Sequence, residues 1–314
     1  METLRAAVIG VGYFGSRHAL RLARLPGVRL EYLVDADRSR TRELALELNA
    51  RTATDYRAVL GSVDIATVAV PTRIHSEVAE ALLGAGIHLL VEKPLTATLE
   101  EADRVVGLAA AKGLVLCVGH LERFNPALIA ARKHISRPRF IEAHRLAPFK
   151  PRGTDVDVVL DLMIHDLDII LSLSDSPVAE VRANGAPVLT GGLDIANARI
   201  EFENGCVANV TASRVSGKEM RKLRVFQSDC YLAVDFRERS VEIARVESNA
   251  DSGPLPGIAL ERIAYSEGDE LQAELAAFVD AVRGLPRNAA SAQEGRRALE
   301  LALLIDHRIR GDSR

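Results

Sequence analysis

Three glycines near the start of the chain constrain its fold more than any other feature. Gly10, Gly12 and Gly15 follow a strand-like run at 6–9 and come just before a helix-like stretch. In this setting the first glycine permits a tight turn, the second lets a pyrophosphate approach the backbone, and the third lets helix and strand pack closely. The free N–H groups at such a helix start attract anions. The predicted cofactor contacts in this loop are Gly10, Gly12, Tyr13, Phe14 and Gly15.

Short β-branched runs alternate with amphipathic stretches along the first 120 residues. The strand-like runs lie at 4–9, 28–35, 63–70, 87–91 and 114–118, with helix-like stretches between them. Such alternation indicates βαβ units and a parallel sheet. We therefore predict that residues 1–121 form a doubly wound α/β domain of the Rossmann type that binds a dinucleotide.

The pattern changes beyond residue 121. A long apolar helix at about 156–173 precedes strand-like runs at 178–184, 194–203, 206–214, 221–228, 231–236 and 241–247. These strand-like runs are closely spaced and joined by turns such as Glu203-Asn204-Gly205, which indicates an antiparallel sheet. Helical stretches at 270–282 and from 291 to about 309 complete the chain. Residues 122–314 are predicted to form a second, α+β domain that binds substrate.

Composition excludes several classes of protein. The chain has 314 residues, of which 48% are hydrophobic, enough for two cores. Its 40 basic and 43 acidic residues do not gather into a run that would follow nucleic acid. A signal-peptide core and a membrane-length apolar run are both missing, which predicts a cytoplasmic protein. Three well-separated cysteines are expected to be buried reduced thiols, with neither a disulfide nor zinc.

An acidic residue ends the second strand-like run. Asp35 lies 25 residues after Gly10, near the spacing at which a carboxylate reaches the ribose hydroxyls of a dinucleotide. A carboxylate there repels the 2′-phosphate of NADP, so the sequence favours NAD. Arg38 and Arg40 lie just beyond and could receive that phosphate, but a solvated helix face is the preferred interpretation of both.

Lys93 comes just after the strand-like run at 87–91 and is followed by a proline. A residue before proline is disfavoured in helical geometry, so Lys93 should project from the strand end, where parallel sheets bind ligands. A lysine at that position can hydrogen-bond a substrate hydroxyl and stabilise charge on its oxygen during hydride transfer. Without Pro94, an ordinary exposed lysine would be the default interpretation.

Four polar residues recur along the apolar helix at 156–173. Asp157, Asp161, His165 and Asp168 are spaced by four, four and three residues, which places them on one face of a regular helix. Buried carboxylates need partners, so a solvent-lined site at this face is expected. A catalytic acid–base role is favoured over a structural role in ion pairs. A metal site is disfavoured, because the line contains a single histidine and lacks a neighbouring ligand cluster.

Taken together, these motifs resemble those of the glucose-fructose oxidoreductase, inositol dehydrogenase and MocA family. The resemblance covers the whole chain and rests on four segments: the 10–15 loop, Glu92-Lys93-Pro94, Arg123-Phe124-Asn125-Pro126, and Asp161 with His165. It implies a Rossmann domain followed by an open-faced sheet domain, with Lys93, Asp161 and His165 at the catalytic positions. The loop 71–75 matches the segment that touches the nicotinamide side in relatives. The further predicted cofactor contacts are Pro71, Thr72, His75, Glu92 and Lys93.

Within the family, three segments look most similar to the branch that oxidises UDP-N-acetylglucosamine at C3 for amino-sugar and lipid A precursor synthesis. They are the Arg-Phe-Asn-Pro form at 123–126, the stretch 152–157 and the stretch 211–214. Cations at 145, 150, 152 and 214 suit a diphosphate, although ordinary surface charge explains them equally well. The predicted substrate-binding residues are Arg123, Asn125, Arg152, Arg214 and Asp168.

The predicted reaction is oxidation of a secondary sugar alcohol by NAD. His165 would take the hydroxyl proton, Asp161 would orient the imidazole, and Lys93 would polarise the oxygen. Lys93 as the base is the alternative, and the sequence does not separate the two. A free polyol or monosaccharide such as inositol or glucose is the alternative substrate. A non-catalytic NAD-dependent sensor is the alternative of another class, which has no need of a proton-transfer set.

Oligomerisation is expected through the second domain. A sheet covered by helices on one side is expected to leave its other face apolar, and the strands at 194–203, 206–214 and 221–228 supply apolar positions for both faces. Pairing of such faces between subunits predicts a homodimer or homotetramer.

Overall fold

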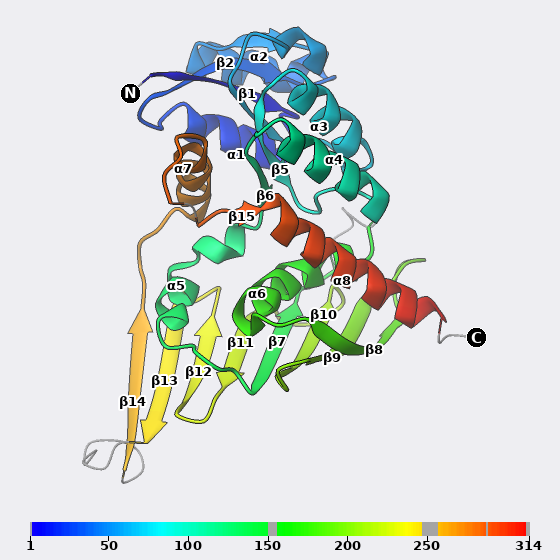
Figure 1. Cartoon of the computed structure of the whole chain (residues 1–314), viewed down its shortest axis with the longest axis vertical. Coiled ribbons are helices and arrows are strands. Elements are labelled where there is room, and N and C mark those ends of the chain that lie inside the picture. The colour runs from blue at the N-terminus through cyan, green and yellow to red at the C-terminus, as the bar shows by residue number, and fades with distance from the viewer. Residues whose placement is uncertain (1, 150–155, 247–256, 287, 312–314) are drawn as a thin grey trace. The chain divides into compact units, whose positions relative to one another are not determined.

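The computed structural model describes residues 2–149, 156–246, 257–286 and 288–311 (Figure 1). The chain divides into two compact units. The first combines Met1–Leu121 with Asp269–Arg296, and the second combines Glu122–Gly268 with Arg297–Arg314. We placed residues 269–296 in the second domain from the sequence, whereas the structure groups this segment with the first unit. The hydrophobic pattern of a helix near the end of a chain does not indicate which unit the helix will pack against.

The first unit contains a seven-stranded sheet with the order β15-β6-β5-β4-β1-β2-β3. All neighbours are parallel except β15, which pairs antiparallel with β6. From β3 to β6 the order is that of a dinucleotide-binding fold. The bounds are β1 (Leu4–Ile9), β2 (Val28–Val34), β3 (Arg51–Ala53), β4 (Ile65–Val68), β5 (His88–Glu92), β6 (Leu116–Gly119) and β15 (Ala290–Ser291).

The helices of this unit begin at residues that suit a helix start. Asp37 and Asp269 each accept a backbone N–H from the first turn that follows, and Thr98 forms a capping box with Glu101. The helices are α1 (Tyr13–Leu22), α2 (Arg38–Leu48), α3 (His75–Gly84), α4 (Leu99–Ala111) and α7 (Glu270–Val282), with 3-10 turns η1 (Tyr56–Val59) and η2 (Thr72–Ile74).

The second unit contains an eight-stranded sheet with the order β14-β13-β12-β11-β7-β10-β9-β8. Only β7 and β10 pair in parallel. The predicted mostly antiparallel α+β domain is confirmed. Its strands are β7 (Phe140–Leu146), β8 (Val178–Ala186), β9 (Ile195–Phe202), β10 (Val207–Ser213), β11 (Met220–Phe226), β12 (Cys230–Asp235), β13 (Ser240–Val246) and β14 (Ile258–Ala264).

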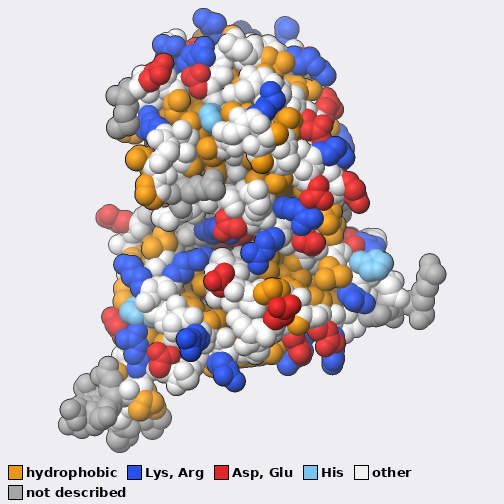
Figure 2. All heavy atoms as spheres, in the orientation of Figure 1, with side chains coloured by type: hydrophobic (Ala, Val, Ile, Leu, Met, Phe, Trp, Pro, Cys, Tyr) orange, Lys and Arg blue, Asp and Glu red, His pale blue; other side chains and the backbone are white. Residues whose placement is uncertain are grey.

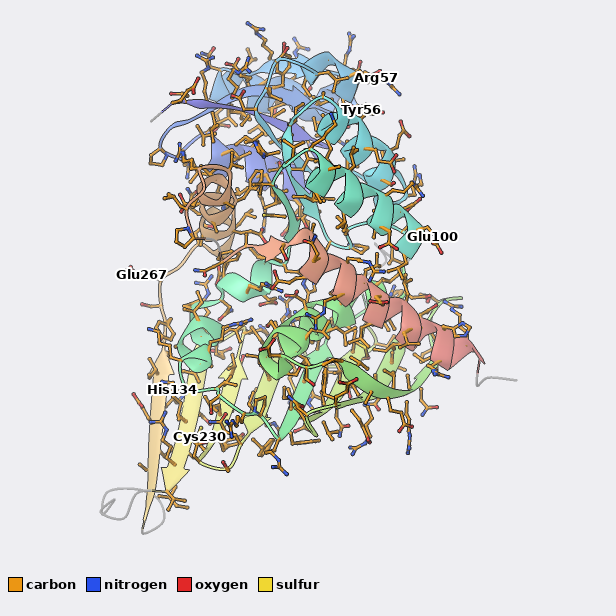
Figure 3. All side chains as sticks on the ribbon, in the orientation of Figure 1. Tyr56, Arg57, Glu100, His134, Cys230 and Glu267 are labelled. Atoms are coloured by element: carbon orange, nitrogen blue, oxygen red, sulfur yellow. The ribbon has the colours of Figure 1, made fainter. Side chains whose placement is uncertain are left out.

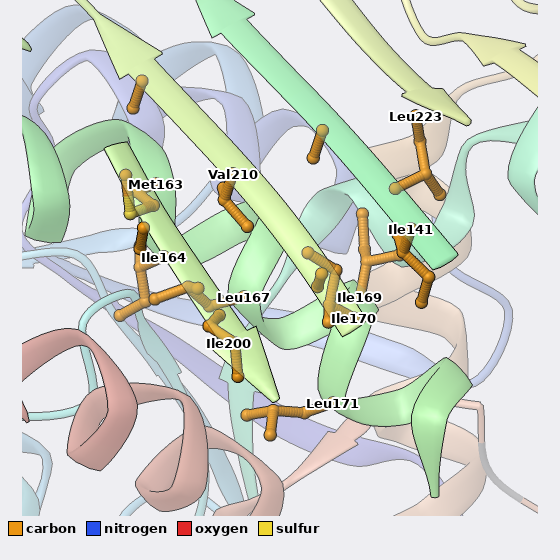
Figure 4. Packing of buried hydrophobic residues seen from close by; sticks show 14 of the residues in the cluster. Ile141, Met163, Ile164, Leu167, Ile169, Ile170, Leu171, Ile200, Val210 and Leu223 are labelled. Atoms are coloured by element: carbon orange, nitrogen blue, oxygen red, sulfur yellow. The ribbon is translucent and has the colours of Figure 1, made fainter. Parts of the chain in front are cut away.

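Helices cover one face of this sheet and bury a single apolar cluster (Figure 4). Side chains such as Ile164, Leu167 and Ile170 pack against Ile141, Val210 and Leu223 of the strands. This packing explains why the helix at 164–174 is apolar on most of its circumference. The elements are η3 (Leu121–Phe124), α5 (Pro126–Arg132), the π-helix η4 (Val159–Met163), α6 (Ile164–Ser174) and α8 (Ala292–Gly311).

The opposite face of this sheet is polar over most of its area, so the prediction of an apolar face was wrong. Glu142, Lys222 and Arg224 point away from the core, because their strand neighbours Ala143, Leu223 and Val225 are buried. Ion pairs join Arg224 to Glu142 and Lys222 to Asp235 across the strands. A shorter apolar row crosses the same face at Phe140, Phe226 and Tyr231, whose ring centroids lie 5.7 and 5.0 Å apart.

Charges of both signs are interspersed over the visible surface of the protein (Figure 2). No helix within the described ranges is both long enough and apolar enough to cross a membrane.

Candidate functional site

The glycine loop of the first unit has the shape of a pyrophosphate cradle. Gly10 adopts φ +88°, and a Cβ there would lie 2.5 Å from the carbonyl oxygen of Ala69. A Cβ at Gly15 would lie 1.7 Å from the carbonyl oxygen of Gly10. Above Gly12, by contrast, Arg40 Nη1 at 3.9 Å is the only described atom within 4 Å of that position. Gly12 precedes α1 without a side-chain cap, so the backbone N–H groups of the first turn suit an anion.

Two aromatic side chains follow this loop. Tyr13 and Phe14 are 56% and 42% exposed although both are large and apolar. Their rings pack edge to face, and Arg17 lies 4.1 Å above the Tyr13 ring. The two rings therefore offer an apolar surface beside the loop.

Asp35 ties the end of β2 to the glycine loop. Its Oδ2 accepts the N–H of Val11 at 2.8 Å and its Oδ1 accepts the N–H of Asp37 at 2.9 Å. A carboxylate has about four acceptor positions, so capacity remains for ribose hydroxyls. Arg40, expected on a solvated helix face, instead lies 3.8 Å from Asp35 and 3.6 Å from Asp37, although it remains 56% exposed. The residues around this loop fit NAD.

The end of β5 carries Lys93, which is half-buried and precedes a cis peptide bond to Pro94. His75, at the start of α3, is buried and uses both ring nitrogens within the unit. They lie 2.9 Å from the carbonyl oxygen of Pro94 and 2.8 Å from that of Val70. His75 thus joins two loops, while Pro71 and Thr72 are exposed and half-exposed beside it. The predicted cofactor contact of His75 stays a prediction, and its observed role is to hold the loops together.

In the second unit, Asp161 and His165 belong to different kinds of helix. Asp161 lies in the π-helix Val159–Met163, and His165 lies in the first turn of α6. Both side chains are half-buried. We expected one regular helix here, but a π-helix bonds each residue to the fifth along the chain, so a spacing of four no longer marks one turn. Such wide turns are frequent at functional sites.

The other two members of the expected polar line have structural partners. Asp157 accepts the N–H of Leu193 at 2.8 Å and pairs with Arg310. Asp168 forms a two-pronged ion pair with Arg123 at 2.6 and 2.7 Å, in which the side chains are only 2% and 9% exposed. A structural role in ion pairs, the less favoured interpretation, describes these two carboxylates.

Several predicted substrate contacts also bind within the protein. Asn125 is buried, accepts the N–H of Ala127 at the start of α5 and donates to the carbonyl oxygen of Phe236. Arg214 is 7% exposed and donates to the carbonyl oxygen of Val156. Arg145, considered as a diphosphate partner, is buried between Asp166 at 2.9 Å and Glu122 at 2.7 Å. Direct substrate contacts by Arg123, Asn125, Asp168 and Arg214 remain predictions, and Arg152 lies outside the described residues.

The three cysteines are free and buried, as predicted. Burial raises the pKa of the Cys206 thiol to about 11. Cys230 lies beside His134 (Figure 3), with its sulfur 3.8 Å from the His134 carbonyl oxygen. Within the described residues, His, Cys, Asp and Glu nowhere form a group of three or more that could hold a metal ion.

Comparison with known proteins identifies the family. Residues 4–120 match the model of an oxidoreductase family with an NAD-binding Rossmann fold, and residues 129–232 match the GFO/IDH/MocA C-terminal domain. The UDP-N-acetylglucosamine 3-dehydrogenase of Acidithiobacillus ferrooxidans is 39% identical over 97% of each chain. The chain belongs to the GFO/IDH/MocA oxidoreductase family. It is an NAD-binding oxidoreductase, and the family predicted from its motifs is confirmed.

Solved structures of relatives have the same fold. The structure of the Acidithiobacillus ferrooxidans enzyme superposes with a TM-score of 0.92, at 38% identity and covering 99% of each chain. A levoglucosan dehydrogenase in complex with NADH and levoglucosan has a TM-score of 0.89 at 18% identity, covering 99% of this chain and 98% of its own, which speaks for the fold alone. The scyllo-inositol 2-dehydrogenase of Bacillus subtilis is 29% identical over 68% of each chain.

Proposed function

We propose that this protein oxidises the C3 hydroxyl of UDP-N-acetylglucosamine to the 3-keto sugar with NAD. The observation that carries the proposal is the similarity to an enzyme of that name, which extends at 39% identity over 97% of both chains. Four inositol dehydrogenases resemble the chain less, at 27% to 31% identity. A free polyol is therefore the second candidate substrate.

The proposed chemistry assigns one task to each of three side chains. When bound, NAD supplies the carbon that accepts the hydride. Lys93 donates a hydrogen bond to the reacting hydroxyl and stabilises the charge that develops on its oxygen. His165 takes the hydroxyl proton, since an imidazole exchanges protons near neutral pH, and Asp161 orients that ring. A sensor without catalysis would need none of these three groups.

A substrate panel tests the proposal. The protein is incubated with NAD and, separately, with UDP-N-acetylglucosamine, other UDP-sugars, inositol and glucose, and NADH absorbance is followed. We expect the fastest reduction of NAD with UDP-N-acetylglucosamine and a product lighter by two hydrogens in mass spectrometry. Faster oxidation of inositol or glucose would replace the substrate assignment. NAD binding without oxidation of any sugar would favour the sensor.

The cytoplasmic location of the protein stays a prediction.

A further inference from the structure

A buried histidine on α1 contacts the residue that precedes Lys93. His18 is fully buried, and its Nε2 lies 2.9 Å from Glu92 Oε1 although the two residues are 74 positions apart. Its other ring nitrogen, Nδ1, is buried and has no hydrogen-bond partner among the described residues. An apolar side chain would fill this position without the cost of burying polar nitrogens. The contact with Glu92 is therefore what the histidine contributes.

The Glu92 carboxylate is enclosed from a third element as well. Glu92 pairs with Gly119 in the ladder between β5 and β6. A Cβ at Gly119 would lie 3.1 to 3.2 Å from the carboxyl carbon and both oxygens of Glu92. Real Cβ contacts are rarely so short, so the carboxylate occupies the space that the missing side chain leaves.

Lys93 lies between two residues that are each held by a buried histidine. His18 contacts the side chain of Glu92, and His75 contacts the carbonyl oxygen of Pro94 at 2.9 Å. The strand end is thus fixed on both sides of the lysine. Fixing a catalytic group matters, because a misplacement of about 1 Å can cost roughly 10²-fold in rate.

Charge reinforces this arrangement. Burial alone would raise the pKa of the Glu92 carboxyl, but the hydrogen bond from His18 and the electrostatic effects of His18 and Lys93 lower it below its ordinary value. An ionised carboxylate only accepts hydrogen bonds, so His18 carries a hydrogen on Nε2.

We propose that His18 and Glu92 are positioning residues for Lys93. His18 fixes the Glu92 carboxylate, and Glu92 keeps the adjoining Lys93 in place. This inference rests on the proposed function and deepens it, because it assigns two residues to holding the lysine that polarises the substrate oxygen.

Kinetics of three variants test the proposal. His18→Leu removes the donor, Glu92→Gln removes the charge, and Gly119→Ala presses on the carboxylate from β6. Each should lower kcat roughly 10- to 10²-fold while KM for the sugar and Kd for NAD change less than about threefold. His18→Gln keeps an N–H donor and should recover most of the loss. Gly107→Ala is the matched control, since a Cβ at this α4 position meets nothing within 4 Å.

A chemical readout works without turnover. Lys93 is labelled with an amine-reactive reagent over a range of pH, and the modified peptide is measured by mass spectrometry. The rate of Lys93 labelling should differ between Glu92→Gln and the native protein, because the lysine loses the neighbour that holds it in place. Lys112, which donates to the carbonyl oxygen of Gly84, serves as the internal control and should not change.

The possible outcomes separate this inference from the proposed function. Native kcat in His18→Leu, measured below its unfolding temperature, would make His18 a packing residue and overturn the proposal. A loss of NAD affinity as large as the loss of kcat would assign Glu92 to cofactor binding instead. Equal labelling of Lys93 in native and Glu92→Gln protein would also overturn it. If native protein oxidises no sugar yet the labelling differs as expected, the proposed function fails and the positioning role stands.

Discussion

Asp35 holds two backbone N–H groups and is predicted to bind the ribose with the same carboxylate. Each of its oxygens accepts one backbone N–H, from Val11 and from Asp37, and ribose hydroxyls would take the remaining acceptor positions. Asp35→Ser should weaken NAD binding roughly 10- to 10²-fold, the value of hydrogen bonds to a charged group, and narrow the preference for NAD over NADP. Fluorescence titration with the reduced forms of both dinucleotides measures the two affinities and their ratio.

Arg40 provides the matching control for this prediction. Its guanidinium lies 3.8 Å from Asp35, so Arg40→Ala removes a cation that would attract a 2′-phosphate. The preference for NAD should widen in this variant. Equal affinity of the native protein for NAD and NADP would contradict the assignment of Asp35.

Lys93 and His165 are predicted to serve one proton transfer. Lys93→Met and His165→Asn should each lower kcat roughly 10²- to 10⁴-fold and leave NAD affinity nearly unchanged. The double variant should be little worse than the poorer single variant, because groups that act in one step do not contribute additively. Steady-state kinetics with the preferred sugar measures both effects. Near-normal turnover of His165→Asn would pass the role of base to Lys93.

Residues in local motifs were predictable, and residues paired over long distances were not. The glycine loop is recognisable because its neighbours in sequence are also its neighbours in space, and Asp35 is recognisable because it follows Gly10 at a characteristic spacing. His18 and Glu92 are 74 positions apart and Arg123 and Asp168 are 45 apart, so no local spacing indicates either contact. The role of His18 was missed for this reason, although it lies only three residues after Gly15.

At the level of elements, the Arg123–Asp168 pair connects the 3-10 turn η3 to α6. Because both side chains are buried, Arg123→Met leaves a buried carboxylate without its arginine and should cost about 3–5 kcal/mol of unfolding free energy. Adding Asp168→Leu should restore much of the lost unfolding free energy, since replacing a buried ion pair by apolar side chains often leaves stability unchanged. Urea unfolding followed by circular dichroism measures both variants.

An exposed pair on the same unit controls for the loss of an arginine. Arg182 and Glu180 lie 2.7 Å apart with side chains 71% and 50% exposed, so Arg182→Met should change stability little. If Arg123→Met instead keeps native stability and raises KM for the sugar, Arg123 contacts substrate, as the sequence predicted.

Elements with an unbroken hydrophobic pattern were predicted. Three elements without such a pattern were missed, each for a different reason. Strand β7 was missed because Arg145 occupies a position that faces the core, where its charge is balanced by Asp166 and Glu122. The π-helix was missed because analysis of spacing assumes 3.6 residues per turn throughout. Strand β14 was missed because most of its residues are exposed at a sheet edge.

At the scale of the whole molecule, we retain a dimer or tetramer joined through the open face of the second unit's sheet as a proposal. The apolar row of Phe140, Phe226 and Tyr231 supports it, although ion-paired residues surround the row. Phe226→Asp should shift the protein toward monomer in light scattering at micromolar concentration, because a charge in an apolar contact is costly. Leu46→Lys is the control, since it also places a charge at an exposed apolar position, on α2, and it should leave the oligomeric state unchanged. A native monomer would refute the proposal.

The first unit is built from two stretches of chain, and this has a consequence for protein synthesis. Strand β15 covers the edge of β6, and Arg283 of the segment after α7 donates to the carbonyl oxygen of Gly27 at 3.0 Å. These contacts cannot form until residues 269–296 have left the ribosome. At about 5–20 residues per second, the first 121 residues wait roughly 10 to 35 seconds for their missing partner. During that interval the edge of β6 that β15 later covers has unpaired backbone groups, which could pair with another chain.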